Sequence, residues 1–176
     1  THAMQRLSAQ QRNAPISILI NANRNVEQYA GMGATVVVDR LRDFQGPLAG
    51  FLAALDACST PYLLTVPCDS PLFPLDLALR MSEALLRSDV QIAVAMAPEQ
   101  VAGGATVLRS QPVFCLMRTE VRESLRLFLE SGGRKVEAWT GSLHQVLVPF
   151  NAVGDDPQAF ANANTLAELQ RLESGL

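Results

Sequence analysis

The chain has 176 residues, 48% of them hydrophobic, which suits one domain (residues 1–176) that buries roughly 70% of its unfolded surface. Its 17 acidic and 14 basic residues give a net charge of −3 without any basic cluster, which argues against a nucleic-acid or anionic-lipid surface. The apolar runs are too short for a membrane span and no signal peptide is recognisable, so we expect a cytoplasmic protein.

Strand-like and helix-like segments alternate along the chain. The strand candidates are residues 16–20, 34–38, 62–66, 90–95, 113–117 and 144–148. Helices are predicted at 1–11, 48–57, 74–87 and 119–130, and a last one starts near 164–165 with Glu168 placed for a capping box. This alternation predicts an α/β protein with a mostly parallel sheet covered on both faces. The segment 99–105, which contains two glycines, is expected to be a loop.

The first segment resembles the back half of a helix, and no strand precedes it. An α/β sheet usually begins with a strand, and in nucleotide enzymes that strand and its glycine-rich turn commonly hold the phosphates. We therefore expect a first strand and a glycine-rich loop upstream of Thr1.

A single acidic residue, Asp69, follows the apolar run 62–66 within the sequence Pro-Cys-Asp-Ser-Pro. In open α/β sheets ligands collect beyond the carboxyl ends of the strands. The flanking Pro67 and Pro71 restrict the turn, and a hard metal ion tolerates little motion of its ligands. Asp69 is therefore predicted to be the centre of a catalytic metal site.

Three more polar residues follow predicted strands: Asn21 and Asn23 after 16–20, and Asp39 after 34–38. An asparagine offers a donor and an acceptor, as a base edge or a ribose requires, and a carboxylate accepts from a sugar hydroxyl or an exocyclic amine. Each residue alone is equally well explained as a turn former. Three of them at successive strand ends favour a nucleoside site.

Weaker signals lie elsewhere. Gly46-Pro47 opens the helix that contains Gly50, and free amides at a helix start attract phosphate, although these residues are also ordinary helix punctuation. Arg134 and Lys135 follow two glycines and are candidates for an anionic substrate, with solvated surface charge as the alternative. Asn162 lies just outside the last predicted helix, within reach of the site. Two histidines and three dispersed cysteines give no basis for a metal trio, a catalytic triad or a disulfide framework.

Taken together, these motifs resemble those of the bacterial molybdenum cofactor guanylyltransferases. The matching stretches are Ile-Asn-Ala-Asn-Arg at 20–24, Val-Asp at 38–39, Gly-Pro-Leu-Ala-Gly at 46–50, Val-Pro-Cys-Asp-Ser-Pro at 66–71, Gln-Pro-Val at 111–113 and Asn-Ala-Asn-Thr at 162–165. Their order and approximate spacing fit along nearly the whole chain. The resemblance implies a three-layer α/β/α nucleotidyltransferase fold and an enzyme that transfers GMP from GTP to molybdopterin, with release of pyrophosphate.

The resemblance also implies roles for individual residues. Asn21, Asp39 and Asp69 match guanine-nucleotide-binding positions, and Asp69 also matches the Mg²⁺ ligand. Candidates for contacting the pterin are Gly50, Arg134, Asn162 and Asn164. The implied partners are GTP and molybdopterin, with molybdoenzymes or other cofactor-biosynthesis proteins as further candidates, and without nucleic acid or membrane.

One part of the family pattern has no counterpart in this sequence. A Leu-Ala-Gly-Gly turn and an Arg-Met-Gly-Gly-x-Asp-Lys stretch bind the triphosphate in the family, and we expect them upstream of Thr1. Two alternatives stay open: a relative that transfers CMP or acts on sugar phosphates, and a binding module that holds molybdopterin without catalysis.

Overall fold

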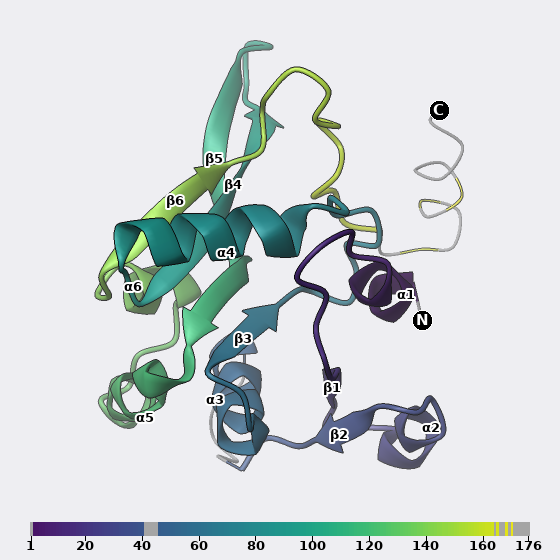
Figure 1. The fold of residues 1–176 in the computed structure, drawn as a ribbon, viewed down its shortest axis with the longest axis vertical. Coiled ribbons are helices and arrows are strands. Elements are labelled where there is room, and N and C mark those ends of the chain that lie inside the picture. Colours follow the sequence, from purple (N-terminus) through teal and green to yellow (C-terminus); the bar gives the residue numbers. More distant parts are fainter. Residues whose placement is uncertain (1, 41–45, 164, 166–167, 169, 171–176) are drawn as a thin grey trace.

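The computed structural model describes residues 2–40, 46–163, 165, 168 and 170. In this part of the chain the strands form two sheets (Figure 1). The smaller sheet pairs β1 (Leu19–Asn21) with β2 (Thr35–Val37) in parallel. The larger sheet has the strand order β3 (Tyr62–Thr65), β5 (Thr106–Arg118), β4 (Ile92–Gln100), β6 (Gln145–Pro149).

The predicted alternation of strands and helices is confirmed. The helices are α1 (His2–Ser8), α2 (Val26–Ala30), α3 (Pro47–Ala57), α4 (Leu77–Ser88), the short 3-10 turn Thr119–Val121, α5 (Arg122–Glu130) and α6 (Val136–Thr140). Thr165 and Glu168 form the expected capping box: the Thr165 amide donates to Glu168 Oε2 at 3.2 Å, and the Glu168 amide donates to Thr165 Oγ1 at 3.1 Å.

The direction of β5 differs from a purely parallel arrangement. The pairing is parallel in β1–β2 and β4–β6, but β5 runs antiparallel to both of its neighbours. The segment 99–105, expected to be a loop, is mostly the tip of a β4–β5 hairpin. Gly103 and Gly104 have φ values of 96° and 79° there, and a tight turn of this kind reverses the chain.

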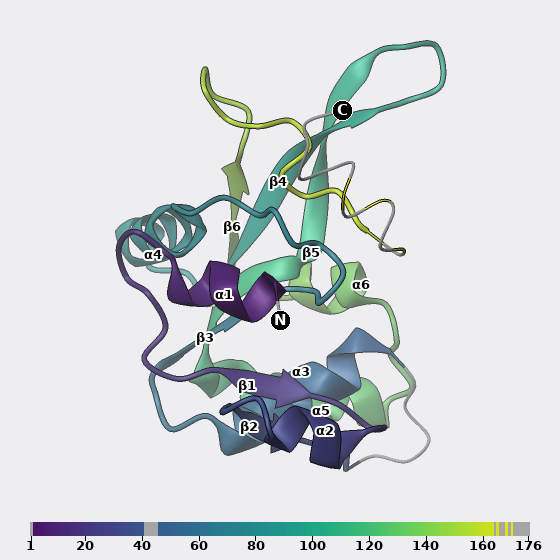
Figure 2. The same ribbon diagram turned by 90° about the vertical axis from the view of Figure 1, so that its right-hand side faces the viewer.

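Helices cover both faces of the larger sheet, which confirms the three-layer arrangement (Figure 2). Successive side chains of a strand point to opposite faces, so Ile92 and Val94 join one buried cluster while Ala93 and Ala95 join the other. The first cluster includes side chains of α3, α5 and α6, and the second includes side chains of α4.

Helix α3 contacts β1 and β2 as well as β3, so it packs on both sheets. Eight of its 11 residues are buried, which explains why this helix is apolar on all sides. Across the described ranges β1 pairs only with β2 and β3 only with β5, so β1 and β3 each keep one edge without a strand partner. None of the helices in these ranges is long and apolar enough to cross a bilayer.

Candidate functional site

The residues expected at the nucleoside lie together at the ends of β1 and β2. The parallel register places Asn21 opposite Val37, two residues before Asp39. Asn21 Nδ2 donates to Asp39 Oδ1 at 2.8 Å, and Asn23 Nδ2 donates to Asp39 Oδ2 at 2.7 Å. The Asp39 amide in turn donates to Asn23 Oδ1 at 2.9 Å. We call Asn21, Asn23 and Asp39 the nucleoside cluster; the expected convergence of these three residues is confirmed.

The nucleoside cluster is accessible to solvent, with Asn21 and Asn23 exposed and Asp39 half-buried, and it keeps free acceptor capacity. Each carboxylate oxygen of Asp39 receives one amide hydrogen, whereas an ionised carboxylate has about four lone-pair sites. The two asparagines thus fix the plane of the carboxylate without saturating it. This arrangement can accept hydrogen bonds from N–H or O–H groups of a ligand.

Gly50 lies in α3 directly against this cluster. It is buried, and a Cβ at this position would stand 2.9 Å from Asn21 Cγ and closer still to Asn21 Oδ1. The absence of a side chain therefore makes room for Asn21. The sequence suggested Gly50 as a contact for the pterin, and the structure places it behind a predicted nucleotide-binding residue.

Asp69 lies in the turn that follows β3 and is half-buried. Its carboxylate makes no hydrogen bond or ion pair with any residue of the described ranges. No group of three or more His, Cys, Asp or Glu side chains within those ranges could hold a metal. Mg²⁺ commonly uses one or two carboxylates and completes its shell with substrate phosphates and water, so a single free carboxylate fits this ion.

The segment after β6 returns to the turn of Asp69. The Ala163 amide donates to the main-chain oxygen of Asp69 at 2.6 Å. The fully buried Ser70 donates its hydroxyl to Asn162 Oδ1 at 2.7 Å. The sequence placed Asn162 within reach of the site, and the structure puts it beside Asp69. Asn164 lies outside the described residues.

Helix α1 holds the same loop from another side. Arg6 Nε donates to the main-chain oxygen of Phe73 at 2.6 Å, and its Nη2 donates to that of Leu72 at 3.2 Å. Sequence reasoning missed Arg6, and no local signal marked it, because its partners lie 66 and 67 positions away.

We expected Asp69 to lie at the same sheet edge as Asn21 and Asp39, and this expectation is wrong: they follow strands of two different sheets. The nucleoside cluster belongs to the smaller sheet, and Asp69 follows a strand of the larger one. Within the described ranges no hydrogen bond or ion pair connects them; both sheets instead pack on α3.

Arg134 lies between α5 and α6 and donates to the main-chain oxygens of Gly133 at 2.8 Å and Leu129 at 3.4 Å. These bonds hold the loop in which it lies. Lys135 is exposed and immediately precedes α6.

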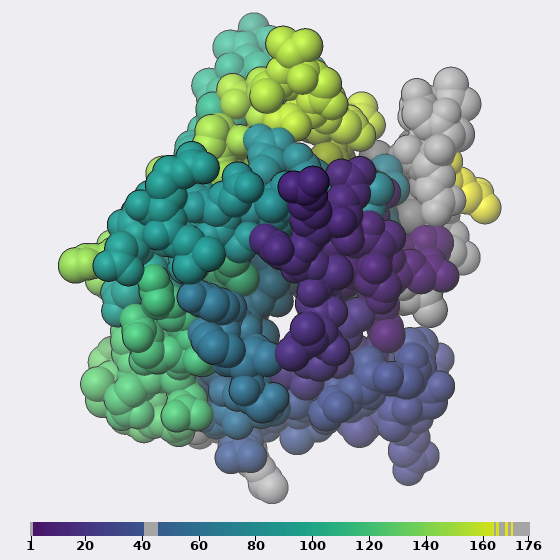
Figure 3. Space-filling view, viewed as in Figure 1, coloured from purple at the N-terminus to yellow at the C-terminus, as the bar shows by residue number. Residues whose placement is uncertain are grey.

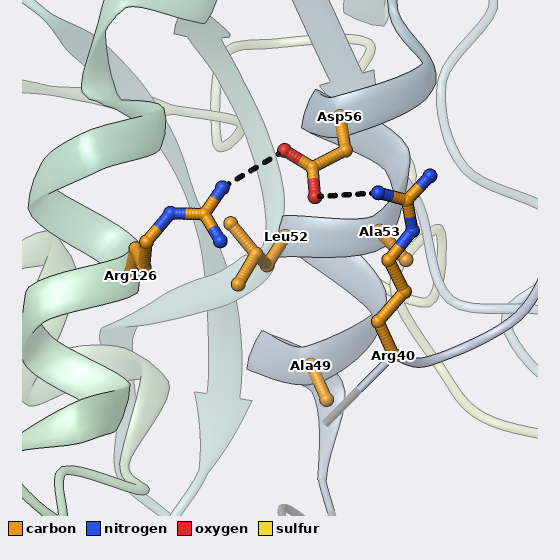
Figure 4. A pocket seen from close by; sticks show the side chains of 6 residues that line it. All are labelled: Arg40, Ala49, Leu52, Ala53, Asp56 and Arg126. Carbon is orange, nitrogen blue, oxygen red and sulfur yellow. Dashed lines mark hydrogen bonds and ion pairs between the residues drawn. The ribbon is translucent and has the colours of Figure 1, made fainter. Parts of the chain in front are cut away.

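A small cavity of about 140 Å³ lies between α3 and α5 (Figure 4). It is lined by Arg40, Ala49, Leu52, Ala53, Asp56 and Arg126. Asp56 pairs with Arg126 at 3.2 Å and with Arg40 at 4.0 Å. The cavity includes no predicted site residue, and its ion pairs join α3 to α5 and to the end of β2.

Comparison with known proteins supports the same family. The chain is 51% identical over 173 residues to a molybdenum cofactor guanylyltransferase of Acidovorax sp. (strain JS42), an alignment that covers 98% of this chain and 80% of the relative. A protein of the same name from Bordetella pertussis (strain Tohama I) is 53% identical over 157 residues, which covers 89% of this chain and 75% of that protein.

A solved structure shares the fold. It is the molybdopterin-guanine dinucleotide biosynthesis protein A of Archaeoglobus fulgidus, with a TM-score of 0.70 at 16% identity, covering 99% of this chain and 86% of that chain. A family model described as the MobA-like NTP transferase domain matches residues 1–172. The chain therefore belongs to the family of MobA-like NTP transferase domains.

Proposed function

We propose that this protein is a molybdenum cofactor guanylyltransferase, which transfers GMP from GTP to molybdopterin and forms the guanine dinucleotide form of the cofactor. The observation that carries the proposal is the 51% identity over 173 residues to a relative of that name. Its substrates are GTP and molybdopterin, its metal is Mg²⁺, and it acts in the cytoplasm.

The nucleoside cluster binds the nucleoside of GTP. Asp39 accepts hydrogen bonds from donors of the nucleoside, and Asn21 and Asn23 hold its carboxylate in a fixed plane. A carboxylate that is oriented before the ligand arrives loses less entropy on binding, which favours affinity and a single pose.

Asp69 is the residue of this chain that would hold Mg²⁺, and phosphate oxygens of GTP would complete the set of ligands. When bound, Mg²⁺ supplies neutralisation of the charge at the α-phosphate. The contribution of the chain is to present one unpaired carboxylate on a loop held by α1 and by residues 162–163.

The reaction requires no covalent intermediate on the enzyme. An oxygen of the terminal phosphate of molybdopterin forms a bond to the α-phosphorus, the bond from that phosphorus to the bridging oxygen of the β-phosphate breaks, and pyrophosphate leaves. Such transfers depend mainly on in-line positioning and charge stabilisation, which the nucleoside cluster and Asp69 provide.

Replacing the metal ligand tests the proposal. The variant Asp69→Asn keeps the size of the side chain and removes its charge, so we expect loss of at least about 100-fold in the rate of GMP transfer. Asp89→Asn is the matched control, because Asp89 has a φ of 47°, which asparagine also adopts, and its side chain is 93% exposed. The measurement is formation of the dinucleotide from labelled GTP and molybdopterin, and an unchanged rate in Asp69→Asn would remove Asp69 from the mechanism.

The same assay separates the alternatives. Parallel reactions contain GTP, CTP or UTP with molybdopterin, and we expect product from GTP. Product from CTP instead would identify a cytidylyltransferase. Binding of molybdopterin without release of pyrophosphate from any nucleotide would identify a binding module.

A further inference from the structure

We propose that Arg80 and Asp155 form a positioning pair that sets the metal affinity of Asp69 from a distance. The link between them is the stretch 150–163, which we call the return segment. The inference rests on the proposed role of Asp69 as the metal ligand.

The return segment leads from the end of β6 back to the turn of Asp69 (Figure 1, yellow-green). It contains no helix or strand. At its far end Ala163 donates to the main-chain oxygen of Asp69, and Asn162 accepts the hydroxyl hydrogen of Ser70. A shift of this segment would therefore move the backbone of Asp69, the proposed metal ligand.

Arg80 of α4 binds the first part of the return segment. Its Nη1 lies 2.8 Å from Asp155 Oδ1 and its Nη2 lies 3.2 Å from Asp155 Oδ2, a bidentate pair. Nη2 also donates to the main-chain oxygen of Pro149, and the guanidinium carbon stands 3.9 Å from the centre of the Phe150 ring. The side chains of Arg80 and Asp155 are only 23% and 16% exposed, and the hydrogen bonds from Arg80 lower the pKa of Asp155.

Packed aromatic rings connect the part of the segment bound by Arg80 with the part near Asp69. The ring centres of Phe150 and Phe160 are 5.2 Å apart, and those of Phe160 and Phe114 are 4.8 Å apart. Phe160 is two residues before Asn162, so the segment is fixed at both ends: by Arg80 at one, and by β5 and the turn of Asp69 at the other.

These contacts form a continuous series of links that begins and ends at Asp69. The loop of Asp69 runs directly into α4, α4 carries Arg80, Arg80 binds Asp155, and the return segment brings Ala163 back to Asp69. Main-chain hydrogen bonds tie the two ends of the segment to its surroundings, from the Phe150 amide to the Met96 oxygen and from the Ala163 amide to the Asp69 oxygen, whereas its middle makes only turn bonds and is held by side chains. Loss of the Arg80–Asp155 pair would release the middle of the segment while leaving the sheets intact, and residues 162–163 would then hold the turn of Asp69 less firmly.

The test compares Asp155→Asn, Arg80→Met and the conservative Arg80→Lys. Arg87→Met is the matched control, since Arg87 is also on α4 but is 79% exposed and pairs only weakly with Glu83 at 3.9 Å. Binding of Mn²⁺ in the presence of GTP is measured by electron paramagnetic resonance, alongside kcat for GMP transfer and the preference for GTP over CTP.

We expect the Kd for Mn²⁺ to rise and kcat to fall about tenfold in Asp155→Asn and Arg80→Met, as for outer partners of metal ligands, with a smaller change in Arg80→Lys. The preference for GTP stays unchanged, because the nucleoside cluster lies on the other sheet. All values are taken below the melting temperature of each variant, followed by the fluorescence of the single tryptophan.

A lower melting temperature with Mn²⁺ affinity equal to that of Arg87→Met would assign the pair a purely structural role and overturn the inference. If Arg80→Met does not fold, Asp155→Asn and Arg80→Lys decide the question. If the wild-type protein neither binds Mn²⁺ nor transfers GMP, the proposed function fails instead, so the two failures are distinguishable.

Discussion

At the scale of single residues, Gly50 shows how a missing side chain shapes a site. Asn21 occupies the space that a Cβ at this position would need. Asn21 in turn donates to Asp39, so the helix position, the asparagine and the carboxylate are coupled. A glycine that sequence reasoning assigned to the pterin thus acts on the nucleoside cluster.

Gly50→Ala should displace Asn21 and break its bond to Asp39. Loss of one such bond costs about 1 kcal/mol, or roughly a fivefold higher Kd for GTP. The free energy of unfolding should change less, because alanine favours the helix over glycine by up to about 1 kcal/mol, and this gain offsets the steric cost of displacing Asn21. Calorimetric titration with GTP measures the effect, and the double variant with Asn21→Ala is the control. If Gly50→Ala weakens binding equally with and without Asn21, the coupling is wrong.

At the scale of elements, the first turn of α4 depends on Gln10, which lies two residues beyond the end of α1. Asp76, at the N-cap position of α4, makes no capping bond with its side chain. The side chain of Gln10 makes the capping bond instead. Its Oε1 accepts a hydrogen bond from the Ala78 amide at 2.8 Å, and its Nε2 donates to the main-chain oxygen of Pro74 at 2.9 Å. Gln10 is only 6% exposed, so both bonds are shielded from water.

Gln10→Met should therefore destabilise the protein by about 2 kcal/mol, since it leaves the buried Ala78 amide without its partner and removes one of the two donors to the Pro74 oxygen, which keeps the Leu77 amide. Urea unfolding, followed by the fluorescence of Trp139, measures this loss. Gln11→Met is the matched control, because Gln11 is exposed and contributes its main-chain amide to Leu75. Equal stability of both variants would show that the Gln10 bonds contribute nothing.

At the scale of the whole molecule, the central strand β5 ties the larger sheet together. It pairs with β3 and with β4, and its Cys115 is fully buried between them. Burial raises the pKa of the Cys115 thiol to about 12, so almost no reactive thiolate exists at neutral pH. Cys68 is exposed and Cys58 is partly buried.

A thiol reagent should consequently label Cys68 rapidly in the native protein and Cys115 only after global unfolding. In a Cys58→Ser/Cys68→Ser background, we expect the urea dependence of Cys115 labelling to follow the unfolding transition seen by Trp139 fluorescence. Labelling of Cys115 well below that transition would show that the sheet opens locally.

Local patterns predicted much of the fold. The strand before Asp69, the helix after Gly46, and the Thr165–Glu168 capping box depend on residues close together in the chain, and the structure has all three. The strand is only partly buried, because it lies at the edge of its sheet. The meeting of Asn21 with Asp39 was also predictable, because parallel strands bring their carboxyl ends together.

The sequence by itself determined the α/β alternation, the nucleoside cluster and the place of Asp69 after a strand, because hydrophobic period and strand-end chemistry are local signals. Only the tertiary structure decided the antiparallel course of β5 and the contacts that hold the turn of Asp69. Those contacts join Arg6 to Leu72, Ser70 to Asn162 and Arg80 to Asp155, pairs 66, 92 and 75 positions apart. No local period links residues at such separations; the packing of α1, α4 and the return segment around one loop brings them together.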